Sequence, residues 1–510
     1  MLRLRLLLIL MLAVGGVLGA CTAGDTITQA QTRLRTIEDY RGTDPGSVSS
    51  LLEGYRKRDE DEVLYRLETA MLHHYRGAWK SSAKQFAKAE RAIEKNYTKS
   101  INRNLQAMLV NDLQLAYDGE PYEDIYLNVF NCLNYLHRHD TEGALVEARR
   151  VAYKLERLND RYRGLAQSLM KRDTAQTALK KADDELDDVD LLTKDEAPPD
   201  IRQNSALGRF LAATLYGKTG APDDARIELQ NLRTALADQG QRRFLTAFSR
   251  AGGAGSSGPD NELPEAWTRD EWTTSDVLST LFEQKSPAES PVSQASRSND
   301  AARTISIPSL RQLTRPNTFN TMLLSFTGRA PMKQERAFHL PLSINEETVQ
   351  LHFAVPVLKT VRSRVERVRA VAAGDTLAVP MIEDMQAVAR KMFDQKKPII
   401  YTRAVLRAIL KAGATEGAEK LAKKKWGKTA AFLTEQAGNV MSYRAAQADT
   451  RGWQTMPGYA HALVAKLPKG THEVAFEFLS DRGRVLERRT QNVTVQGARD
   501  FVLAESVYLK

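Results

Sequence analysis

Cysteines, long apolar runs and recognisable catalytic motifs are all scarce in this chain. Of its 510 residues, only Cys21 and Cys132 are cysteines. Cys132 lies in a run of Leu, Val, Phe and Tyr, which predicts a small buried apolar residue. The one long apolar run, residues 6–20, is shorter than the roughly 20 residues that a membrane-spanning helix requires. No later segment supplies a spanning helix.

Motifs for common kinds of enzyme chemistry are also missing. The sequence has neither a Gly-x-Ser-x-Gly elbow nor a His-Glu-x-x-His pair. The glycine run at 251–258 lacks the Lys-Ser/Thr ending of a phosphate-binding loop. His137 and His139 stand beside Asp140, where helix capping or exposure to solvent explains them better than metal binding. We therefore expect no catalytic residue set, no metal and no cofactor.

The charge balance is mildly basic, with a formal net charge of +10. This excess is spread along the chain without a nucleic-acid-binding motif, so nucleic acid is not an expected partner. At Lys423–Trp426, three cations stand beside an aromatic residue. This segment predicts a solvated helix face or, alternatively, contact with anionic lipid or cell-wall polymer.

The first 21 residues have the pattern of a secretory signal peptide, with Arg3 and Arg5, an apolar run and small residues before Cys21. The ending Leu-Gly-Ala-Cys resembles the lipobox of bacterial lipoproteins. The resemblance implies that residues 1–20 are removed and that Cys21 receives a diacylglycerol and a further acyl chain such as palmitate. It also implies that no intramolecular disulfide forms in the mature chain. An ordinary signal peptide that ends near a cysteine is the alternative.

The expected location is the outer membrane, lipid-anchored and facing the periplasm. Two or more acyl chains hold a protein stably, because each buried methylene contributes about 0.8 kcal/mol. Thr22 stands where the inner-membrane retention signal of enterobacteria has Asp. Residues 21–46 contain Thr, Gln and Gly and are expected to form the lipidated tether.

Residues 47–249 are predicted to form an all-α domain, because Ala, Leu and Tyr recur at three- and four-residue spacing. Breaks at 77–79, 139–141 and 220–222 divide the predicted helices into pairs. A long charged helical insertion is predicted near residues 151–195.

The three breaks resemble the turns of tetratricopeptide repeats. Turn-to-turn spacings of 62 and 81 residues depart from the usual period of about 34, so the repeats would be degenerate. An irregular helical bundle is the alternative. If the repeat register is right, inward-facing positions form a groove for partner proteins, and we expect it to include His74, Tyr75, His137, Phe210 and Lys218. The resemblance rests on small, aromatic, turn and large residues at the expected positions, namely Ala70, His73, Gly77, Trp79, Phe86, Ala89, Cys132, Tyr135, Asp140, Ala144, Ala148, Ala213, Tyr216, Gly220, Ala225, Leu229 and Leu232.

The rest of the chain is predicted to be a flexible linker, residues 250–302, followed by an α+β domain, residues 303–510, with β-sandwich-like strands. Strict alternation at 349–355 and 473–479 predicts strands, and Gly470 and Gly483 mark expected hairpin turns. Two helices, 382–393 and 399–447, are expected on either side of Pro398.

Five short sequence segments, spread over most of the chain, resemble those of a family of large, poorly characterised bacterial lipoproteins with tetratricopeptide-like N-terminal halves. The family has no agreed enzymatic activity, so the resemblance implies none for this chain. Members of the family tend to accompany small lipoproteins related to curli-secretion components and to activators of penicillin-binding proteins. These segments are residues 121–126, 133–136, 142–150, 328–331 and 448–457.

Two short motifs are the strongest site candidates in the C-terminal domain. Asp449, Arg451 and Trp453 follow a predicted long helix and lead into the last strands, and Arg329 follows a predicted strand. A capped or locked turn is the favoured interpretation of both, and a ligand or partner site is the alternative.

The sequence thus predicts a membrane-anchored periplasmic scaffold that binds other envelope proteins. One alternative is an enzyme acting on peptidoglycan or polysaccharide, with convergent carboxylates in residues 303–510. Another is a regulatory subunit of a secretion, cell-wall-synthesis or motility complex. Contact with peptidoglycan or anionic lipid fits these hypotheses equally, and homo-oligomerisation is left open.

Overall fold

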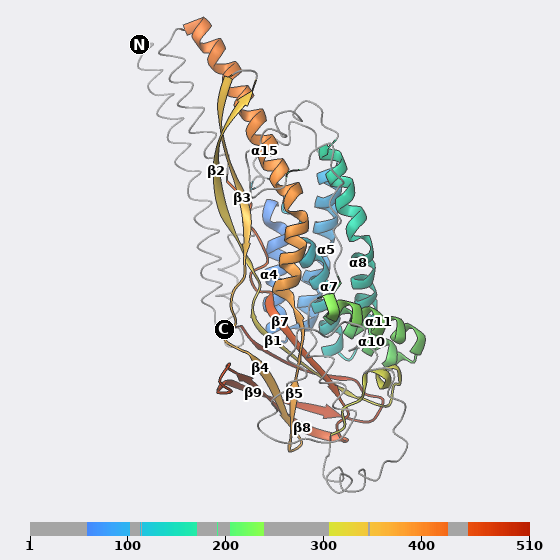
Figure 1. Cartoon of the computed structure of the whole chain (residues 1–510). Coiled ribbons are helices and arrows are strands. Elements are labelled where there is room, and N and C mark those ends of the chain that lie inside the picture. The colour runs from blue at the N-terminus through green and yellow to red at the C-terminus, as the bar shows by residue number, and fades with distance from the viewer. Residues whose placement is uncertain are drawn as a thin grey trace, which may run out of the picture.

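The structure is a computed structural model that describes residues 59–101, 113, 115–170, 191, 204–238, 305–344, 347–426 and 447–509. Helices fill the N-terminal half of these residues, and mixed sheets with one long helix follow (Figure 1). The predicted order of an all-α region and then an α+β region is confirmed at this level. None of the helices within the described ranges is long and apolar enough to cross a membrane.

Four parts of the predicted organisation lie outside the described residues. These are the signal peptide, Cys21, the lipidated tether and the linker at 250–302. Residues 151–170 and 191 of the predicted charged insertion are described, and the 30-residue helix that starts at Thr141 continues to Met170.

Three helical hairpins make up the described N-terminal half, and their turns coincide with the three predicted breaks. Each turn contains a residue with positive φ, namely Gly77 at 75°, His139 at 57° and Gly220 at 79°. Glycine adopts this conformation without a Cβ clash, and the Gly220 N–H also caps its helix by donating to the Tyr216 carbonyl. The helices are α4 (Glu62–Tyr75), α5 (Trp79–Ile101), α7 (Pro121–His137), α8 (Thr141–Met170), α10 (Ala206–Thr219) and α11 (Pro222–Asp238).

The described strands form two four-stranded sheets and one isolated hairpin. In the first sheet, ordered β10-β1-β7-β6, β1 runs parallel to β10 and antiparallel to β7. The second sheet is antiparallel in the order β5-β4-β8-β9, and β10 contacts both β8 and β9. The strands are β1 (Thr321–Arg329), β2 (Met332–Ile344), β3 (Glu347–Lys359), β4 (Arg367–Ala372), β5 (Asp375–Val379), β6 (Met381–Asp384), β7 (Pro457–Ala465), β8 (Gly470–Leu479), β9 (Val485–Val495) and β10 (Val502–Tyr508).

The strands expected from strict alternation are confirmed, and one of the two expected hairpin turns is not. Residues 349–355 lie in β3 and residues 473–479 in β8. Gly483, with φ of 74°, turns β8 into its neighbour β9 as predicted. Gly470 begins β8 after β7, but these two strands belong to different sheets, so their connection is not a hairpin.

The helix boundary expected at Pro398 is wrong. A single 42-residue helix, α15 (Met385–Trp426), contains Pro398, and Ile382 belongs to strand β6. Proline removes one helical hydrogen bond, but packing on both sides of it maintains the helix. Val388 and Val405 are buried, and the Tyr401 hydroxyl donates to the Pro356 carbonyl of β3 at 3.1 Å. Residues 427–446 of the expected second helix lie outside the described residues.

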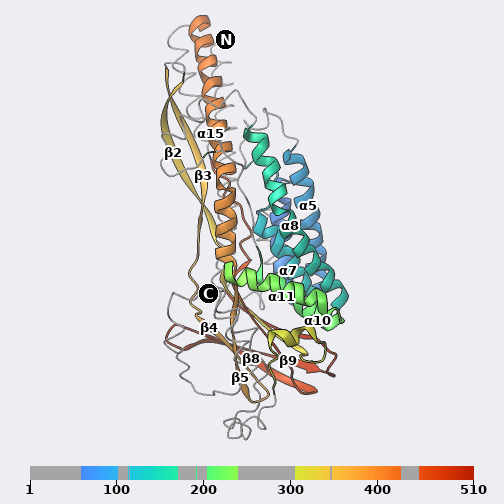
Figure 2. The ribbon, with the colours of Figure 1, turned by 45° about the vertical axis from the view of Figure 1, so that its right-hand side comes forward.

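Helix α15 and the β2–β3 hairpin together form an arm. Both views show them side by side, extending away from the two four-stranded sheets (Figures 1 and 2). At its base, the arm contacts α7 and α8 of the helical half.

The helical hairpins and the sheets share one core. The ring of Phe130, on α7, lies 5.1 Å from that of Phe326, on β1, and 5.8 Å from that of Trp453, between centroids. All three side chains are almost fully buried. The helical half is therefore packed directly against the C-terminal half along the described ranges.

Candidate functional site

Of the five residues predicted to line a partner groove, His74, Tyr75, His137 and Lys218 bond to the chain's own C-terminal half, and Phe210 is buried within α10. His74 and Phe210 are fully buried, and Tyr75 is 7% exposed. The Tyr75 hydroxyl donates to the Thr455 carbonyl at 2.7 Å. Strands and loops of the same chain thus occupy the face that the repeat register would leave open to a partner.

His74 and His137 converge on one carboxylate, that of Glu505 in β10. The Nε2 atoms of the two histidines each lie 2.8 Å from a different oxygen of Glu505. His137 also stacks on Trp79, with ring centroids 3.8 Å apart and planes 4° from parallel. The cluster therefore joins α4, α5 and α7 to the last strand of the chain.

The hydrogen-bond partners of His74 suit its doubly protonated, charged form. Ser82 Oγ donates to the Ala70 carbonyl and accepts from Asn134 Nδ2, so Asn134 Oδ1 is free to accept from His74 Nδ1 at 2.9 Å. With Glu505 at Nε2, both ring nitrogens of His74 face acceptors, as in an imidazolium.

The pKa shifts of the pair agree with this geometry. Burial by itself would lower the pKa of His74, but the Glu505 charge and the bonds from Glu505 and Asn134 outweigh it, so the pKa is raised. Burial would raise the pKa of Glu505, but the charge of His74 and the bonds from His137 and His74 lower it. The pair is therefore an ionic contact within the core.

Replacing Glu505 with glutamine is expected to lower the free energy of unfolding by about 2 kcal/mol near pH 5.5. The lowered pKa of Glu505 gives stability that is present above its ordinary value of 4.5 and lost as the pH falls further. The raised pKa of His74 gives stability that is full below 6.5 and lost as the pH rises through the folded-state value. Urea unfolding should therefore show the largest difference from the unsubstituted protein between these limits.

Glu487→Gln is the control for this pH profile, because the Glu487 side chain is 40% exposed on β9. We expect its unfolding free energy to follow that of the unsubstituted protein at every pH. An equal loss in Glu505→Gln at pH 5.5 and 8.5 would show that the His74 charge does not contribute.

Lys218 also contacts the C-terminal half instead of an open groove. Its ammonium donates to the carbonyls of Pro316 and Phe319, both at 2.7 Å, and to that of Ala498 at 3.2 Å. Burial lowers the pKa of Lys218 to about 8. The side chain holds three backbone oxygens together at the end of α10.

Arg451 is the centre of a buried ionic cluster. Its guanidinium donates to both carboxylate oxygens of Asp449, at 2.9 and 2.8 Å, and to Asp61 at 3.1 Å. It also donates to the Leu115 carbonyl and lies 5.2 Å from the centre of the Tyr117 ring. Burial would raise the pKa of Asp449, but Arg451 lowers it to about 2. These contacts fix the segment before β7 to the start of the helical half.

The residues after Arg451 are held by carboxylates that their sequence context did not single out. Glu123 of α7 accepts from the Trp453 N–H at 2.7 Å, and Glu68 of α4 accepts from the N–H groups of Gln454 and Thr455 at 2.7 and 3.2 Å. Burial raises the pKa of both glutamates to about 7. These hydrogen bonds lock the turn before β7. A locked turn is the interpretation that the sequence favoured for Asp449, Arg451 and Trp453.

Two further buried glutamates connect distant elements. Glu120 accepts from Lys333 at 2.6 Å and from Lys396 at 3.0 Å, which joins α7 to both parts of the arm. Glu383 accepts from the N–H of Ala206 at 2.8 Å and so caps the start of α10. In the sequence, each of these glutamates stands inside or beside an otherwise apolar or turn segment. That pattern indicates an unusual glutamate but does not identify the residue that it contacts.

Arg329 is placed at the end of β1, as its predicted turn position implies. Its Nε donates to the Leu509 carbonyl at 3.3 Å. The preceding Gly328 has φ of 63°, and the following Ala330 N–H bonds the Met456 carbonyl. These contacts connect the end of β1 to the residues just after β10 and just before β7.

The thiol of Cys132 is removed from solvent, as its apolar surroundings in the sequence predict. Cys132 is fully buried, and burial raises the pKa of its thiol. No group of three or more His, Cys, Asp or Glu within the described ranges is arranged to hold a metal ion.

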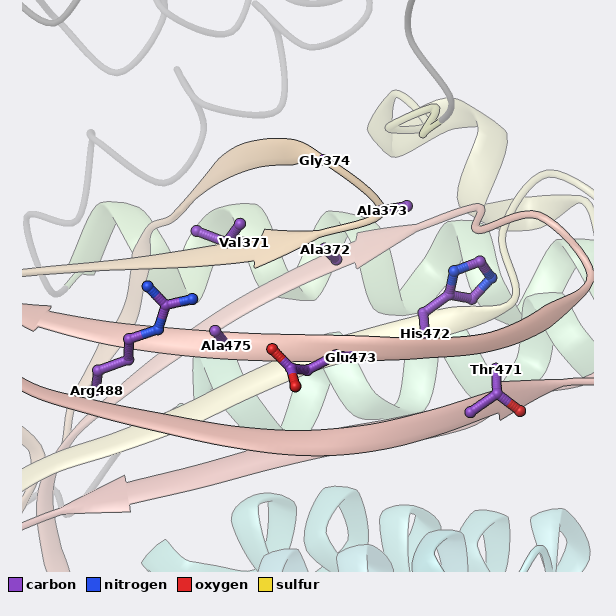
Figure 3. Close-up of a pocket in the computed structure, with 9 residues that line it drawn as sticks. All are labelled: Val371, Ala372, Ala373, Gly374, Thr471, His472, Glu473, Ala475 and Arg488. Carbon is purple, nitrogen blue, oxygen red and sulfur yellow. The ribbon is translucent and has the colours of Figure 1, made fainter.

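A hollow of ≈ 380 Å³ lies beside strands β4 and β8 (Figure 3). Of the nine residues that line it, Glu473 alone bears a carboxylate, and Arg488 lies nearby on β9. The paired carboxylates of a glycan-cleaving enzyme are therefore not present in this hollow. The lining residues are Val371, Ala372, Ala373, Gly374, Thr471, His472, Glu473, Ala475 and Arg488.

Comparison of the chain with models of known protein families, with curated proteins and with solved structures finds no significant match.

Proposed function

We propose that this chain is a lipid-anchored scaffold of the bacterial cell envelope that binds other envelope proteins on the periplasmic side of the outer membrane. The observation on which the proposal rests is the Leu-Gly-Ala-Cys ending directly after a charged and apolar start, with Cys21 as the acylated residue. The three helical hairpins would be degenerate tetratricopeptide-like units. Their small residues at the expected positions support this, since Ala70 and Ala144 are fully buried.

The packing of the described residues suits a rigid support. Ion pairs and hydrogen bonds at Glu505, Arg451 and Glu120 join the helical half to the sheets and the arm. Because the chain fills its own helical face, the proposal places partner contacts on the outside of the helices. Exposed large apolar side chains occur there, with Val146 and Tyr153 on α8 at 46% and 55% exposure and Ile227 on α11 at 56%. Tyrosine, the residue type at 153, is enriched in interface centres.

The experiment uses two proteins in growing cells, one with Cys21 and one with Cys21→Ser. In both proteins a photo-crosslinking residue replaces Tyr153. A labelled fatty acid should be incorporated only when Cys21 is present, and the labelled chain should sediment with the outer membrane. Crosslinks from Tyr153 to envelope proteins should be lost in Cys21→Ser. A crosslinker at the exposed Val485 of β9 is the matched control and should give few adducts. An unlabelled protein, or one free in the cytosol, would contradict the proposal.

A further inference from the structure

Two histidines lie directly opposite each other on the arm. In the antiparallel β2–β3 pairing, His339 faces His352. Their ring centroids are 4.8 Å apart, and their Nδ1 atoms are 2.6 Å apart. His339 is exposed and His352 half-buried. Two imidazole nitrogens therefore converge at the surface.

The register beneath the two rings is held by apolar pairs on either side. Phe338 stacks on Phe353, with centroids 5.2 Å apart and planes 9° from parallel. Leu340 pairs with Leu351, and these leucines are 6% and 1% exposed. Because side chains alternate along a strand, these pairs point to the face opposite the histidines and pack inward. The two Cα positions beneath the imidazoles are thus fixed before any ligand arrives.

We propose that His339 and His352 form a two-histidine site for a late-transition-metal dication, such as Zn²⁺, Ni²⁺ or Cu²⁺. Neutral imidazole is a common protein ligand for these ions, with metal–nitrogen bonds of about 2.0–2.1 Å. Two such bonds need the nitrogens about 3 Å apart, and a small side-chain rotation opens the present separation to that value. Among these ions, Cu²⁺ binds nitrogen ligands most tightly.

Both rings can serve as ligands in their neutral form, because each neutral imidazole has one unprotonated nitrogen with a lone pair. The two Nδ1 atoms already face one another across the strands at 2.6 Å. The metal would replace the contact between the two rings by a bridge across the strands.

The proposed site is open on one side. The described residues provide no third His, Cys, Asp or Glu to complete a closed metal cluster. Water, or a side chain from a bound protein, would fill the remaining coordination positions. The bridge would stabilise the β2–β3 hairpin, because a ligand that binds only the folded state raises its stability. This inference does not depend on the proposed envelope function.

Calorimetric titration of the purified mature protein with Zn²⁺ at neutral pH tests the site. We expect one bound ion per chain, and we expect either His339→Gln or His352→Gln to weaken binding by about tenfold or more. His472→Gln is the control, because this histidine lies on β8 and bonds the Pro468 carbonyl. It should bind Zn²⁺ as the unsubstituted protein does.

A spectroscopic measurement distinguishes this site from others on the chain. With one equivalent of Cu²⁺, electron paramagnetic resonance should show two coupled imidazole nitrogens, reduced to one in either single variant. Without metal, the melting temperature of His339→Gln should equal that of the unsubstituted protein, since His339 is exposed. No Zn²⁺ uptake, or uptake that neither arm substitution reduces, would overturn the proposal, as would a loss that only His472→Gln produces.

Discussion

Replacing Arg451 with methionine is expected to lower the free energy of unfolding by about 4 kcal/mol. The Arg451 side chain is 3% exposed, and it balances the charges of Asp449 and Asp61, of which Asp61 is fully buried. Methionine has a similar length but removes the positive charge beside Asp61, which is fully buried, and beside Asp449, which is 21% exposed. Removing one member of a buried ionic cluster costs far more than the cluster's net contribution to stability. Urea unfolding at neutral pH, followed by circular dichroism, measures the loss.

Two matched variants separate charge balance from the loss of a long side chain. Arg226→Met removes an arginine that is 67% exposed and paired with the exposed Asp223, so we expect little change in its unfolding free energy. Arg451→Lys keeps the charge but not the forked geometry that reaches both aspartates and the Leu115 carbonyl, so it should restore only part of the stability. If Arg451→Met were as stable as Arg226→Met, the cluster would not hold the two halves together.

The helical hairpins could be predicted because their signals are local. Each turn has a residue suited to positive φ, and each adjoining helix has apolar residues at helical spacing. The strands at 349–355 and 473–479 alternate strictly, which is again a pattern that neighbouring residues determine. Pro398 shows the limit of such rules, since packing of α15 against β3 overrides the proline's effect on the helix.

The contacts of the predicted site residues could not be foreseen, because their partners are remote in sequence. His74 and Glu505 are 431 residues apart, and Arg451 and Asp61 are 390 apart. The sequence placed His74 and His137 on inward helix faces, and the structure does turn them inward. What occupies that face is decided by tertiary packing. The role of Trp453 was easier to predict from local sequence, because its position just before the last predicted strands already indicated a locked turn.

Replacing Gly217 with alanine is expected to lower the free energy of unfolding by about 3 kcal/mol or more. Gly217 lies in α10 (Ala206–Thr219), where a Cβ would come 1.8 Å from the backbone oxygen of Leu313 in the 3₁₀ turn Leu310–Thr314. A backbone oxygen cannot rotate away as a flexible side chain can, so the helix and the turn must separate. That separation would also disturb Lys218, which holds the carbonyls of Pro316 and Phe319 just beyond.

Gly164→Ala is the matched control, because Gly164 also lies within a helix, α8, but a Cβ added there would meet no neighbouring element within 4 Å. Alanine is favoured over glycine inside a helix, so this variant should gain up to about 1 kcal/mol. The two substitutions are chemically identical and are expected to change stability in opposite directions, which thermal unfolding resolves directly. Equal effects would mean that helix propensity, and not the contact between α10 and the turn, dominates at Gly217. Opposite effects would show that close backbone approach at this point holds α10 against the 3₁₀ turn that precedes β1.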